Sequence, residues 1–574
     1  MTRTDSIVVG TLVVLLALVA GLVGVPALQA TTARATAVPS EPVEAQPYRE
    51  GILGAPVSIS PLTARSQADR DLVALIFSGL VRNGPDGTLV PDLAKSWSVD
   101  PTGKVWTFHL RDDATWQDGE PVTAEDVAFT IRTLQDSAYV GPAAGSWSDV
   151  EVQAVDEHTV TFTLTMPLGG FLQAATQPIA PAHILADVPV DQLADHPFGT
   201  QPVGSGPFAL ADLTDTTATL VPVTDTTSGG PLPDPSAGTV DSLATPAPTL
   251  RPEHPLPYLT GIDITFYDDP AALSAAYRAG DLDAASGLSP ADAAELASEP
   301  ASRLLRYPGA TLTAALLNLR PTHPEFADPA VRTALLAGLE RTRMVDGVFA
   351  GSAVPATGPI PPSSPMYDAT ADPGVAYDRA AARKALKTAG WAIKDDGWHL
   401  PKASKPLTIE VISPDQKSNL LVWTTAKQVA SDWRRLGFTV THLGLPAADF
   451  VDRLSKGAYQ VAVTDVAIGL DPDLYPLLAS TQTVTGASNI IGVQDPALDK
   501  LLTTARAPGT PEARLAAYAA LQVQLAKGRY LLPLAFQDEV VVARDRLQGP
   551  GLRQVADASD RFWDVLTWRL AEDR

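Results

Sequence analysis

The stretch "WTFHLRDDATWQDGEPVTAEDV", residues 106–127, contains in succession the signals for a strand, a turn and a helix start. In "WTFHL" large apolar residues alternate with polar ones, which is the period of a strand with one buried face. The pair Asp118-Gly119 is typical of a tight turn. Thr123, followed three residues later by Asp126, resembles a capping box in front of an apolar helix. The stretch therefore predicts strand, turn and capped helix.

The same stretch is crowded with acidic side chains that could be read as a carboxylate pair for acid–base catalysis. These residues are Asp112, Asp113, Asp118, Glu120, Glu125 and Asp126. However, acids beside a turn and a helix N-terminus are also stabilised by capping and by the helix dipole. We therefore interpret the stretch as scaffold and predict no catalytic residue in it.

The composition of the whole chain limits the possible functions. With 574 residues, 45% of them hydrophobic and 19% charged, the chain is expected to fold into three or four globular units. A formal charge of −23 and the absence of a basic run predict no nucleic-acid partner. The chain has no cysteine, which excludes disulfides, thiolate metal sites and a lipid-modified N-terminal cysteine.

No motif in the chain predicts catalysis, a metal or a cofactor. The eight histidines lack a spacing that would place two of them on one face, and neither a nucleophile elbow nor a Walker loop is present. The glycine-rich "VGSGPF" has no following helix, so we interpret it as a bend rather than a phosphate loop. "DPDLY", residues 471–475, lacks the remaining ligand positions of a calcium loop. The sequence therefore predicts a protein that is not an enzyme.

The N-terminal residues 1–30 are predicted to direct export. Residues 7–28 are uncharged and mostly apolar, close to the ~20 residues that span a bilayer, whereas a cleaved signal has an apolar region of ~7–15 residues. Two A-x-A sequences follow at 33–35 and 35–37, so a cleaved signal peptide and an uncleaved membrane anchor both remain possible. Residues 31–46 form an Ala/Pro/Thr spacer.

Later parts of the chain show further organisation. A short extended piece is expected at residues 55–59, ahead of an apolar helix, and a low-complexity insertion at about 223–257. The second half alternates strands with helices, which indicates an α/β domain with substantial parallel pairing. The last strand, within residues 531–545, is expected to return to an earlier sheet.

Five segments, in order, are similar to the extracytoplasmic solute-binding proteins of family 5, the peptide- and nickel-type receptors of ABC importers. The resemblance is collinear from about residue 55 to 536. The segments are "GLVRNGPDGTLVPDLAKSWSVDPTGKVWTFHLRDDATWQDGEPVTAEDV" (79–127), "GSGPF" (204–208), "AGDLDAA" (279–285), "FADPAVRTALLAGLERTRMVDGVFAG" (326–351) and "YDRAAARKALKTAGW" (377–391).

This resemblance implies an α/β, bilobal periplasmic-binding-protein fold of type II in its three-domain variant, with mixed sheets and a ligand cleft between the lobes. The implied domains are a discontinuous domain I (47–66, 201–305 and 540–574), a domain II (67–200) and a domain III (306–539). The insertion at about 223–257 would lie within domain I.

The resemblance also implies a function. Such a protein would capture an oligopeptide or peptide-like solute by lobe closure and deliver it to the transmembrane subunits of an ABC permease. It would act as a monomer at the extracytoplasmic face of the cell membrane, either anchored by its N-terminal segment or released. Two alternatives remain open: the same fold binding a metal chelate, an opine or a glycoconjugate, and a membrane-tethered sensor or structural protein without transport.

One loop departs from the family pattern. In peptide-binding members, an aspartate in an "aromatic-x-x-D-Y-P-D-P" loop meets the α-ammonium group of the peptide, since a buried cation needs a paired carboxylate. Here the loop is "VTDVAIGLDPDLY", residues 463–475, and aligning its D-P places Ile468 where that aspartate should be. Either Asp465 or Asp471 takes the role, or the protein does not bind a free amino terminus.

The candidate ligand-binding residues follow from these positions. They lie after the first strand, in the bend between lobes, at a strand end and in the departing loop: Ser58, Ser60, Ser205, Asn318, Asp465 and Asp471. No metal ligand and no cofactor site are predicted.

Overall fold

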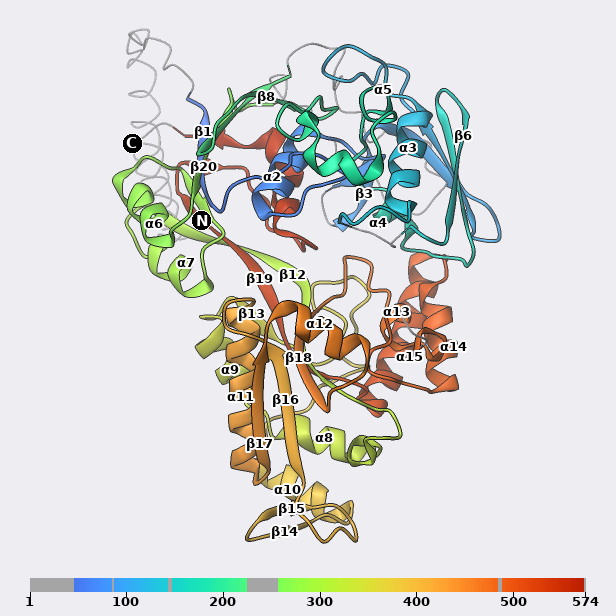
Figure 1. Ribbon diagram of the computed structural model, residues 1–574, viewed down its shortest axis with the longest axis vertical. Helices are drawn as coiled ribbons and strands as arrows, with labels where there is room; N and C mark the ends of the chain where they lie inside the picture. The colour runs from blue at the N-terminus through green and yellow to red at the C-terminus, as the bar shows by residue number, and fades with distance from the viewer. Residues whose placement is uncertain (1–45, 85–86, 143–146, 224–256, 484–487, 572–574) are drawn as a thin grey trace, which may run out of the picture. The chain divides into compact units, whose positions relative to one another are not determined.

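The computed structural model describes residues 46–571 except for 85–86, 143–146, 224–256 and 484–487 (Figure 1). The predicted signal or anchor and nearly all of the spacer and of the low-complexity insertion therefore lie outside the described residues. Among the described helices, none is both long and apolar enough to cross a membrane.

The opening stretch folds as its sequence predicts. Its strand is β5 (Val105–Leu110), whose large apolar side chains are buried, and its helix is α3 (Ala124–Gln135). Gly119 has a φ of +94°, the left-handed conformation that a turn glycine provides. The N–H of Thr123 donates to the carboxylate of Asp126 (2.8 Å), which is the reciprocal half of a capping box. The predicted strand, turn and capped helix are confirmed.

β5 belongs to a four-stranded antiparallel sheet with the order β4-β5-β7-β6, in which β4 is Ala94–Val99, β6 is Val150–Asp156 and β7 is Thr159–Leu164. A larger, 11-stranded sheet has the order β17-β16-β18-β12-β19-β11-β1-β10-β9-β8, with β13 paired to β19. Its strands are β1 (Tyr48–Leu53), β8 (Phe208–Leu213), β9 (Thr217–Pro222), β10 (Ile262–Tyr267), β11 (Ala284–Ser286), β12 (Ser302–Leu317), β13 (Ala353–Pro355), β16 (Thr408–Pro414), β17 (Thr439–Leu445), β18 (Val461–Ala467) and β19 (Leu532–Arg544).

The remaining elements complete the described chain. The other helices are α2 (Gln67–Ile76), α4 (Phe171–Ala174), α5 (Ala182–Leu185), α6 (Pro270–Ala279), α7 (Pro290–Leu296), α8 (Pro329–Ala337), α9 (Arg341–Val348), α10 (Arg379–Thr388), α11 (Leu420–Leu436), α12 (Ala447–Ser455), α13 (Tyr475–Leu478), α14 (Pro496–Arg506) and α15 (Pro511–Gly528). Short 3₁₀ helices are η2 (Val190–Asp195), η3 (Pro197–Gly199), η4 (Pro324–Phe326), η5 (Ser480–Thr483) and η6 (Ala558–Thr567). Short strand pairs are β2 (Val81–Asn83) with β3 (Leu89–Pro91), β14 (Ala392–Lys394) with β15 (Gly397–His399), and β20 (Leu547–Gln548) with β21 (Arg569–Leu570).

The large sheet is mixed, as the sequence predicts. β16 pairs in parallel with β17 and β18, and β1 in parallel with β10 and β11, whereas β12 pairs antiparallel with β18 and β19. The strand within residues 531–545 is β19, and its pairing with β12 and β11 confirms the expected return to an earlier sheet. Crossovers through helices explain the parallel pairs, because a hairpin can join only antiparallel strands.

Two groups of elements, each with its own buried apolar side chains, share the large sheet. One core surrounds the four-stranded sheet, β1, β8–β10 and the C-terminal segment; we call these elements the first lobe. Other cores lie around β16–β18, α11, α14 and α15 within residues 312–536, which we call the second lobe. The long strands β12 and β19 run through both (Figure 1). We call these two the hinge strands.

The expected extended piece at residues 55–59 is wrong. The first strand is β1, and residues 55–59 lie in no strand. The N–H groups of Val57 and Ser58 both donate to Asp69 Oδ1, at 2.5 and 2.9 Å, and Pro56 has no N–H to donate. The amides that a strand would need are therefore bound at the start of α2.

The glycines of "VGSGPF" allow the chain to cross closely over the end of α2. The Gly206 N–H donates to the Ile76 carbonyl (2.8 Å), and a Cβ on Gly206 would lie 2.7 Å from the Ile76 carbonyl carbon. A Cβ on Gly204 would overlap the Ile76 carbonyl oxygen. The motif is thus explained by close backbone packing.

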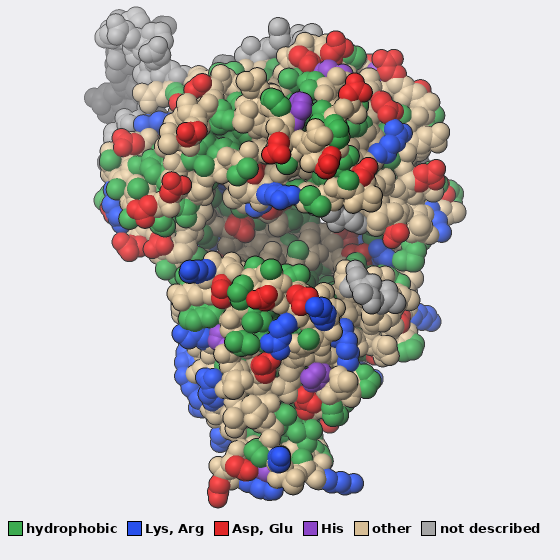
Figure 2. Space-filling model, viewed as in Figure 1, with side chains coloured by type: hydrophobic (Ala, Val, Ile, Leu, Met, Phe, Trp, Pro, Cys, Tyr) green, Lys and Arg blue, Asp and Glu red, His purple; other side chains and the backbone are tan. Residues whose placement is uncertain are grey.

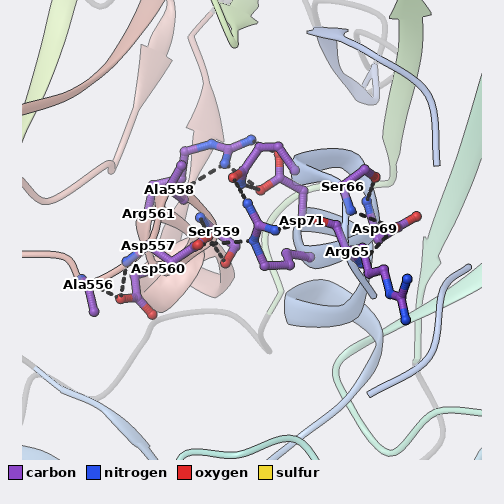
Figure 3. Close-up of polar contacts among 12 residues, drawn as sticks. Arg65, Ser66, Asp69, Asp71, Ala556, Asp557, Ala558, Ser559, Asp560 and Arg561 are labelled. Atoms are coloured by element: carbon purple, nitrogen blue, oxygen red, sulfur yellow. Dashed lines mark hydrogen bonds and ion pairs between the residues drawn. The ribbon is translucent and has the colours of Figure 1, made fainter. Parts of the chain in front are cut away.

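Within the first lobe, a buried ionic cluster fastens η6 of the C-terminal segment to α2 (Figure 3) and to β1. Arg561 of η6 donates to both carboxylate oxygens of Asp71 on α2 (2.7 Å each) and to Glu50 on β1 (2.8 Å). The Tyr48 hydroxyl donates to the other oxygen of Glu50 (2.8 Å). Burial raises the pKa of Asp71, and the charge of Arg561 opposes this rise. Three elements that are distant in sequence are therefore held by one guanidinium.

Candidate functional site

A hollow in the surface lies between the two lobes. Figure 2, viewed as in Figure 1, shows it above α12 and β18, with acidic side chains visible inside. The carboxyl ends of the parallel strands β16 and β18 lie in the second lobe, and in open α/β sheets ligands bind beyond such ends.

Asp465 lies near the carboxyl end of β18 and is held by three neutral donors. Thr313 of β12 donates to Oδ1 at 2.7 Å, and Gln537 of β19 donates to the same oxygen at 2.8 Å. Asn419, the N-cap of α11, donates to Oδ2 at 3.2 Å. Both hinge strands and a helix N-terminus therefore orient this carboxylate.

The carboxylate of Asp465 has no cationic partner in the part of the chain that the structure describes. No lysine, arginine or histidine forms an ion pair with it there. Burial raises its pKa, and the hydrogen bonds from Thr313, Asn419 and Gln537 oppose this rise. A half-buried carboxylate with only neutral donors can still accept a cation.

Asp471, the other candidate acid of the departing loop, is already neutralised. Arg514 Nη2 of α15 donates to both of its oxygens, at 2.8 and 2.7 Å, and the Tyr518 hydroxyl donates to Oδ1 at 3.3 Å. Asp473 of the same loop pairs with Arg506 of α14 at 2.8 Å. The loop therefore binds helices α14 and α15 through its aspartates.

Ile468, at the position where the family has its aspartate, is 5% exposed and packs in an apolar core with Leu312 and Leu474. An aspartate in this place would be buried among apolar side chains without a polar partner. An isoleucine at position 468 fits these surroundings, although the family has an aspartate there.

The three candidate serines are each 4% exposed and bonded within the protein. The hydroxyls of Ser58 and Thr63 lie 2.5 Å apart, Ser60 Oγ accepts from the Leu62 N–H (3.3 Å), and Ser205 Oγ accepts from the Ser78 N–H (3.1 Å). All of these contacts stabilise loops of the first lobe.

Asn318 is fully buried at the end of β12. Its amide group donates to the carbonyls of Gly457 and Tyr459, at 3.0 and 2.8 Å, and its oxygen accepts from Arg320. The nitrogen of the side chain is thus used to hold the connection between α12 and β18, and its oxygen binds Arg320, which follows β12. Among the six candidates, Asp465 alone carries a charge that no described residue neutralises.

Sequence reasoning did not identify the partners of Asp465, because Thr313, Asn419 and Gln537 are at least 46 positions away from it. Two of these partners, Asn419 and Gln537, do stand at recognisable positions in the sequence. Asn419 precedes an apolar helical run, which is the position of an N-cap. Gln537 is the first polar residue after the apolar run "LLPLAF" in a strand.

A second, half-buried acid, Asp92, is linked to Ser205 through Ser78. Ser78, whose N–H donates to Ser205, also donates its hydroxyl to Asp92. Burial raises the pKa of Asp92 from 3.8 to about 6, opposed by the charge of Arg82. Burial likewise raises the pKa of Asp564 to about 6.

These two shifts predict how stability depends on pH. Because the folded state holds these protons more tightly than the unfolded state, the free energy of unfolding should rise as the pH falls from about 7 towards 4. A shift of about two units corresponds to about 3 kcal/mol per group at most. Thermal melts at pH 5 and 7.5 measure the effect.

Asp92→Asn should reduce this pH dependence, whereas the exposed Asp212→Asn should leave it unchanged. An equal difference in melting temperature between the two pH values for wild type and Asp92→Asn would contradict the assignment.

Comparison with known proteins gives a consistent result. The family model described as "Bacterial extracellular solute-binding proteins, family 5 Middle" matches residues 88–489. Protein XP55 of Streptomyces lividans is 30% identical over 505 residues, covering 87% of this chain and 85% of that protein. The nickel-binding periplasmic protein of Escherichia coli (strain K12) is 25% identical, covering 86% and 90%. The periplasmic oligopeptide-binding protein OppA of the same strain is 25% identical, covering 83% and 85%.

Solved structures share the fold. HbpA2 from Haemophilus parasuis aligns with a TM-score of 0.73 at 21% identity, covering 91% of this chain and 99% of its own. The oligopeptide-binding protein AppA from Bacillus subtilis, in complex with a nonapeptide, aligns with a TM-score of 0.68 at 20% identity, covering 92% and 100%. The predicted bilobal α/β fold class is thereby confirmed.

Proposed function

Because the chain belongs to the bacterial extracellular solute-binding proteins of family 5, the binding components of ABC importers, we propose that it captures an oligopeptide or peptide-like solute. It delivers this solute to the transmembrane subunits of an ABC permease. A relative named as an oligopeptide-binding protein and a shared fold with a nonapeptide complex support the solute class. The protein acts as an exported monomer at the extracytoplasmic face of the membrane, either anchored or released.

One observation carries the solute class within this family: the carboxylate of Asp465 has three neutral donors and no cation among the described residues. A carboxylate in such surroundings is stabilised when a solute brings an ammonium group, as the amino terminus or a lysine side chain of a peptide does. Asp471 does not offer the same binding, since Arg514 already neutralises it.

Closure of the lobes must be driven by contacts that form only in the closed state. Moving an open:closed ratio from 99:1 to 1:99 requires about 5.5 kcal/mol of differential affinity. An ammonium held at Asp465 contributes part of this free energy, and main-chain hydrogen bonds along an extended solute contribute more. Because Thr313 and Gln537 lie on the hinge strands, a solute bound at Asp465 sits beside the two strands that run through both lobes.

Asp465→Asn is expected to weaken solute binding by about 10- to 100-fold, because a hydrogen bond to a charged group contributes about 1.5–3 kcal/mol. Wild-type affinity should also fall on acidification, since protonation of Asp465 removes the anion. Because burial raises the pKa of Asp465, the affinity should be lost at a higher pH than the protonation of an ordinary aspartate would require. Isothermal titration calorimetry over a range of pH measures both effects.

The matched control is Asp452→Asn, which removes an exposed carboxylate that pairs with Lys456 and should leave the affinity unchanged. Peptides with a free amino terminus should bind more tightly than the same peptides after acetylation, unless a lysine provides the cation. A solute at a hundredfold excess over its dissociation constant stabilises the protein by about 2.7 kcal/mol, so a peptide library can be screened by melting temperature.

The peptide-like solute would be excluded by two results together. These are the absence of any melting shift with a broad peptide library and the identification by mass spectrometry of a co-purified metal chelate, opine or glycoconjugate. Equal affinities of wild type and Asp465→Asn for a bound peptide would instead reject the role of Asp465.

A further inference from the structure

The two lobes touch at a place separate from the hinge strands. Figure 1 shows β12 and β19 on one side of the second lobe and helices α14 and α15 on the other, reaching towards the four-stranded sheet. The turn between α14 and α15, residues 507–510, meets two turns of the first lobe. These are the turn between β4 and β5 and the turn that precedes α4.

Glycines on the first lobe permit this contact. The Gly169 N–H donates to the Arg506 carbonyl at 2.7 Å. A Cβ on Gly169 would lie 3.1 Å from both the Ala507 carbonyl oxygen and the Pro508 Cα. A Cβ on Gly103 would overlap the ring of Pro508. Backbones from the two lobes are therefore packed directly on one another.

Gly170, the next residue, lies against the loop that follows β18. A Cβ there would lie 2.7 Å from Asp471 Cγ. Because Arg514 neutralises this carboxylate, the glycine turn packs against an ion pair and not against an unpaired charge. Asp473 pairs with Arg506, the residue whose carbonyl accepts from Gly169. The two loop aspartates thus hold in place the groups that touch the first lobe.

We propose that these groups form a clasp that holds the lobes closed away from the hinge strands. The clasp consists of Gly103, Gly169 and Gly170 of the first lobe and of Asp471, Arg506 and Pro508 of the second. Within the proposed function, on which this role rests, the clasp couples solute capture to closure. Asp465 and Asp471 lie six positions apart, on β18 and on the loop that follows it.

The size of the clasp suits a reversible closure. It contains one backbone hydrogen bond between the lobes and a few van der Waals contacts, and its ion pair lies within the second lobe, so it can open without leaving an unpaired charge. A contact present only in the closed state shifts the population towards that state and raises apparent affinity without touching the solute.

Gly169→Val in the full chain tests the clasp without any solute. The branched side chain would collide with Ala507 and Pro508, so the lobes should separate and the radius of gyration from small-angle scattering should increase. The matched control is Gly509→Ala in the same turn, where the added methyl meets nothing closer than 3.7 Å and the scattering should not change. A radius of gyration for Gly169→Val equal to that of the wild type would overturn the proposal.

A second variant avoids any ambiguity from misfolding. The chain has no cysteine, so Gly169→Cys with Pro508→Cys introduces a single possible disulfide, whose geometry requires nearby Cα atoms. If the clasp forms in solution, mild oxidation should crosslink the folded protein, and reduction should restore the original scattering. Failure to crosslink under native conditions would also overturn the proposal. A clasp confirmed in this way, with no peptide bound in calorimetry, would reject the proposed solute alone.

Discussion

Replacement of Arg561 by methionine is expected to lower the free energy of unfolding by about 3–5 kcal/mol, because it leaves two carboxylates buried without a cation. Arg561 is 3% exposed, and Glu50 and Asp71 are both 0% exposed. Methionine keeps most of the side-chain volume, so the loss should arise mainly from the unpaired charges.

Arg561 also joins parts of the chain that are far apart. Arg561 lies 490 positions after Asp71 on α2 and 511 after Glu50 on β1. Without the guanidinium, the buried carboxylates of Asp71 and Glu50 repel each other, and the C-terminal segment loses a polar attachment to α2 (Figure 3) and to β1. Protection from proteolysis at the C-terminal segment should therefore fall together with the unfolding free energy.

Urea denaturation followed by circular dichroism measures the effect. The control Arg278→Met removes an exposed arginine that pairs with Glu295 and Glu299, and should cost 0–1 kcal/mol. Adding Asp71→Asn to Arg561→Met should recover part of the loss, since it removes one unpaired charge. Equal stability of Arg561→Met and Arg278→Met would show that the buried cluster does not hold the segment.

Gly204→Ala is expected to destabilise the protein by about 3 kcal/mol or more, since overpacking against a rigid neighbour forces backbone shifts. The added methyl would overlap the carbonyl oxygen of Ile76 and lie 2.5 Å from its Cγ2 atom. The glycine is also fixed on both sides: its N–H donates to Gln117 Oε1 (3.0 Å), and its carbonyl accepts from the Gln117 N–H (2.9 Å). Neither Gly204 nor the backbone of Ile76 can move apart without a loss of hydrogen bonds or packing.

The control variant should change the stability of the protein in the opposite direction. Gly347 lies inside helix α9, where a methyl group would meet no atom within 4 Å. Gly347→Ala should therefore stabilise the protein by about 0.5–1 kcal/mol, because alanine loses less conformational freedom in a helix. Melting temperatures of the two variants, measured side by side, check both signs. An unchanged melting temperature for Gly204→Ala would reject the close approach to Ile76.

Local patterns predicted the elements well where the forces act over a few residues. The strand, turn and helix of residues 106–127 depend on alternation, one glycine and one cap, and all three are confirmed. The glycine after α6, Gly280, adopts a φ of +86°, as a helix stop requires. Residues 55–59 were predicted wrongly because Asp69, more than ten positions away, accepts hydrogen bonds from the N–H groups of Val57 and Ser58.

The candidate site was predictable only in part. The sequence placed two aspartates in one short loop, Asp465 and Asp471, but their spacing could not distinguish an open carboxylate from a neutralised one. The distinction depends on Arg514, which lies 43 positions after Asp471, and on Gln537, which lies 72 positions after Asp465. The contact of Gly170 with Asp471 leaves no pattern in the sequence, because the two residues lie in different lobes.

The sequence by itself therefore determined the family, the order of most strands and helices and the absence of cysteine chemistry, because these depend on residue types and on short-range periodicity. Only the tertiary structure decided which aspartate keeps an open carboxylate, why "GSGPF" needs its glycines and where the lobes touch. Ion pairing, close backbone approach and lobe contact depend on distances between residues that chain folding, and not chain order, brings together.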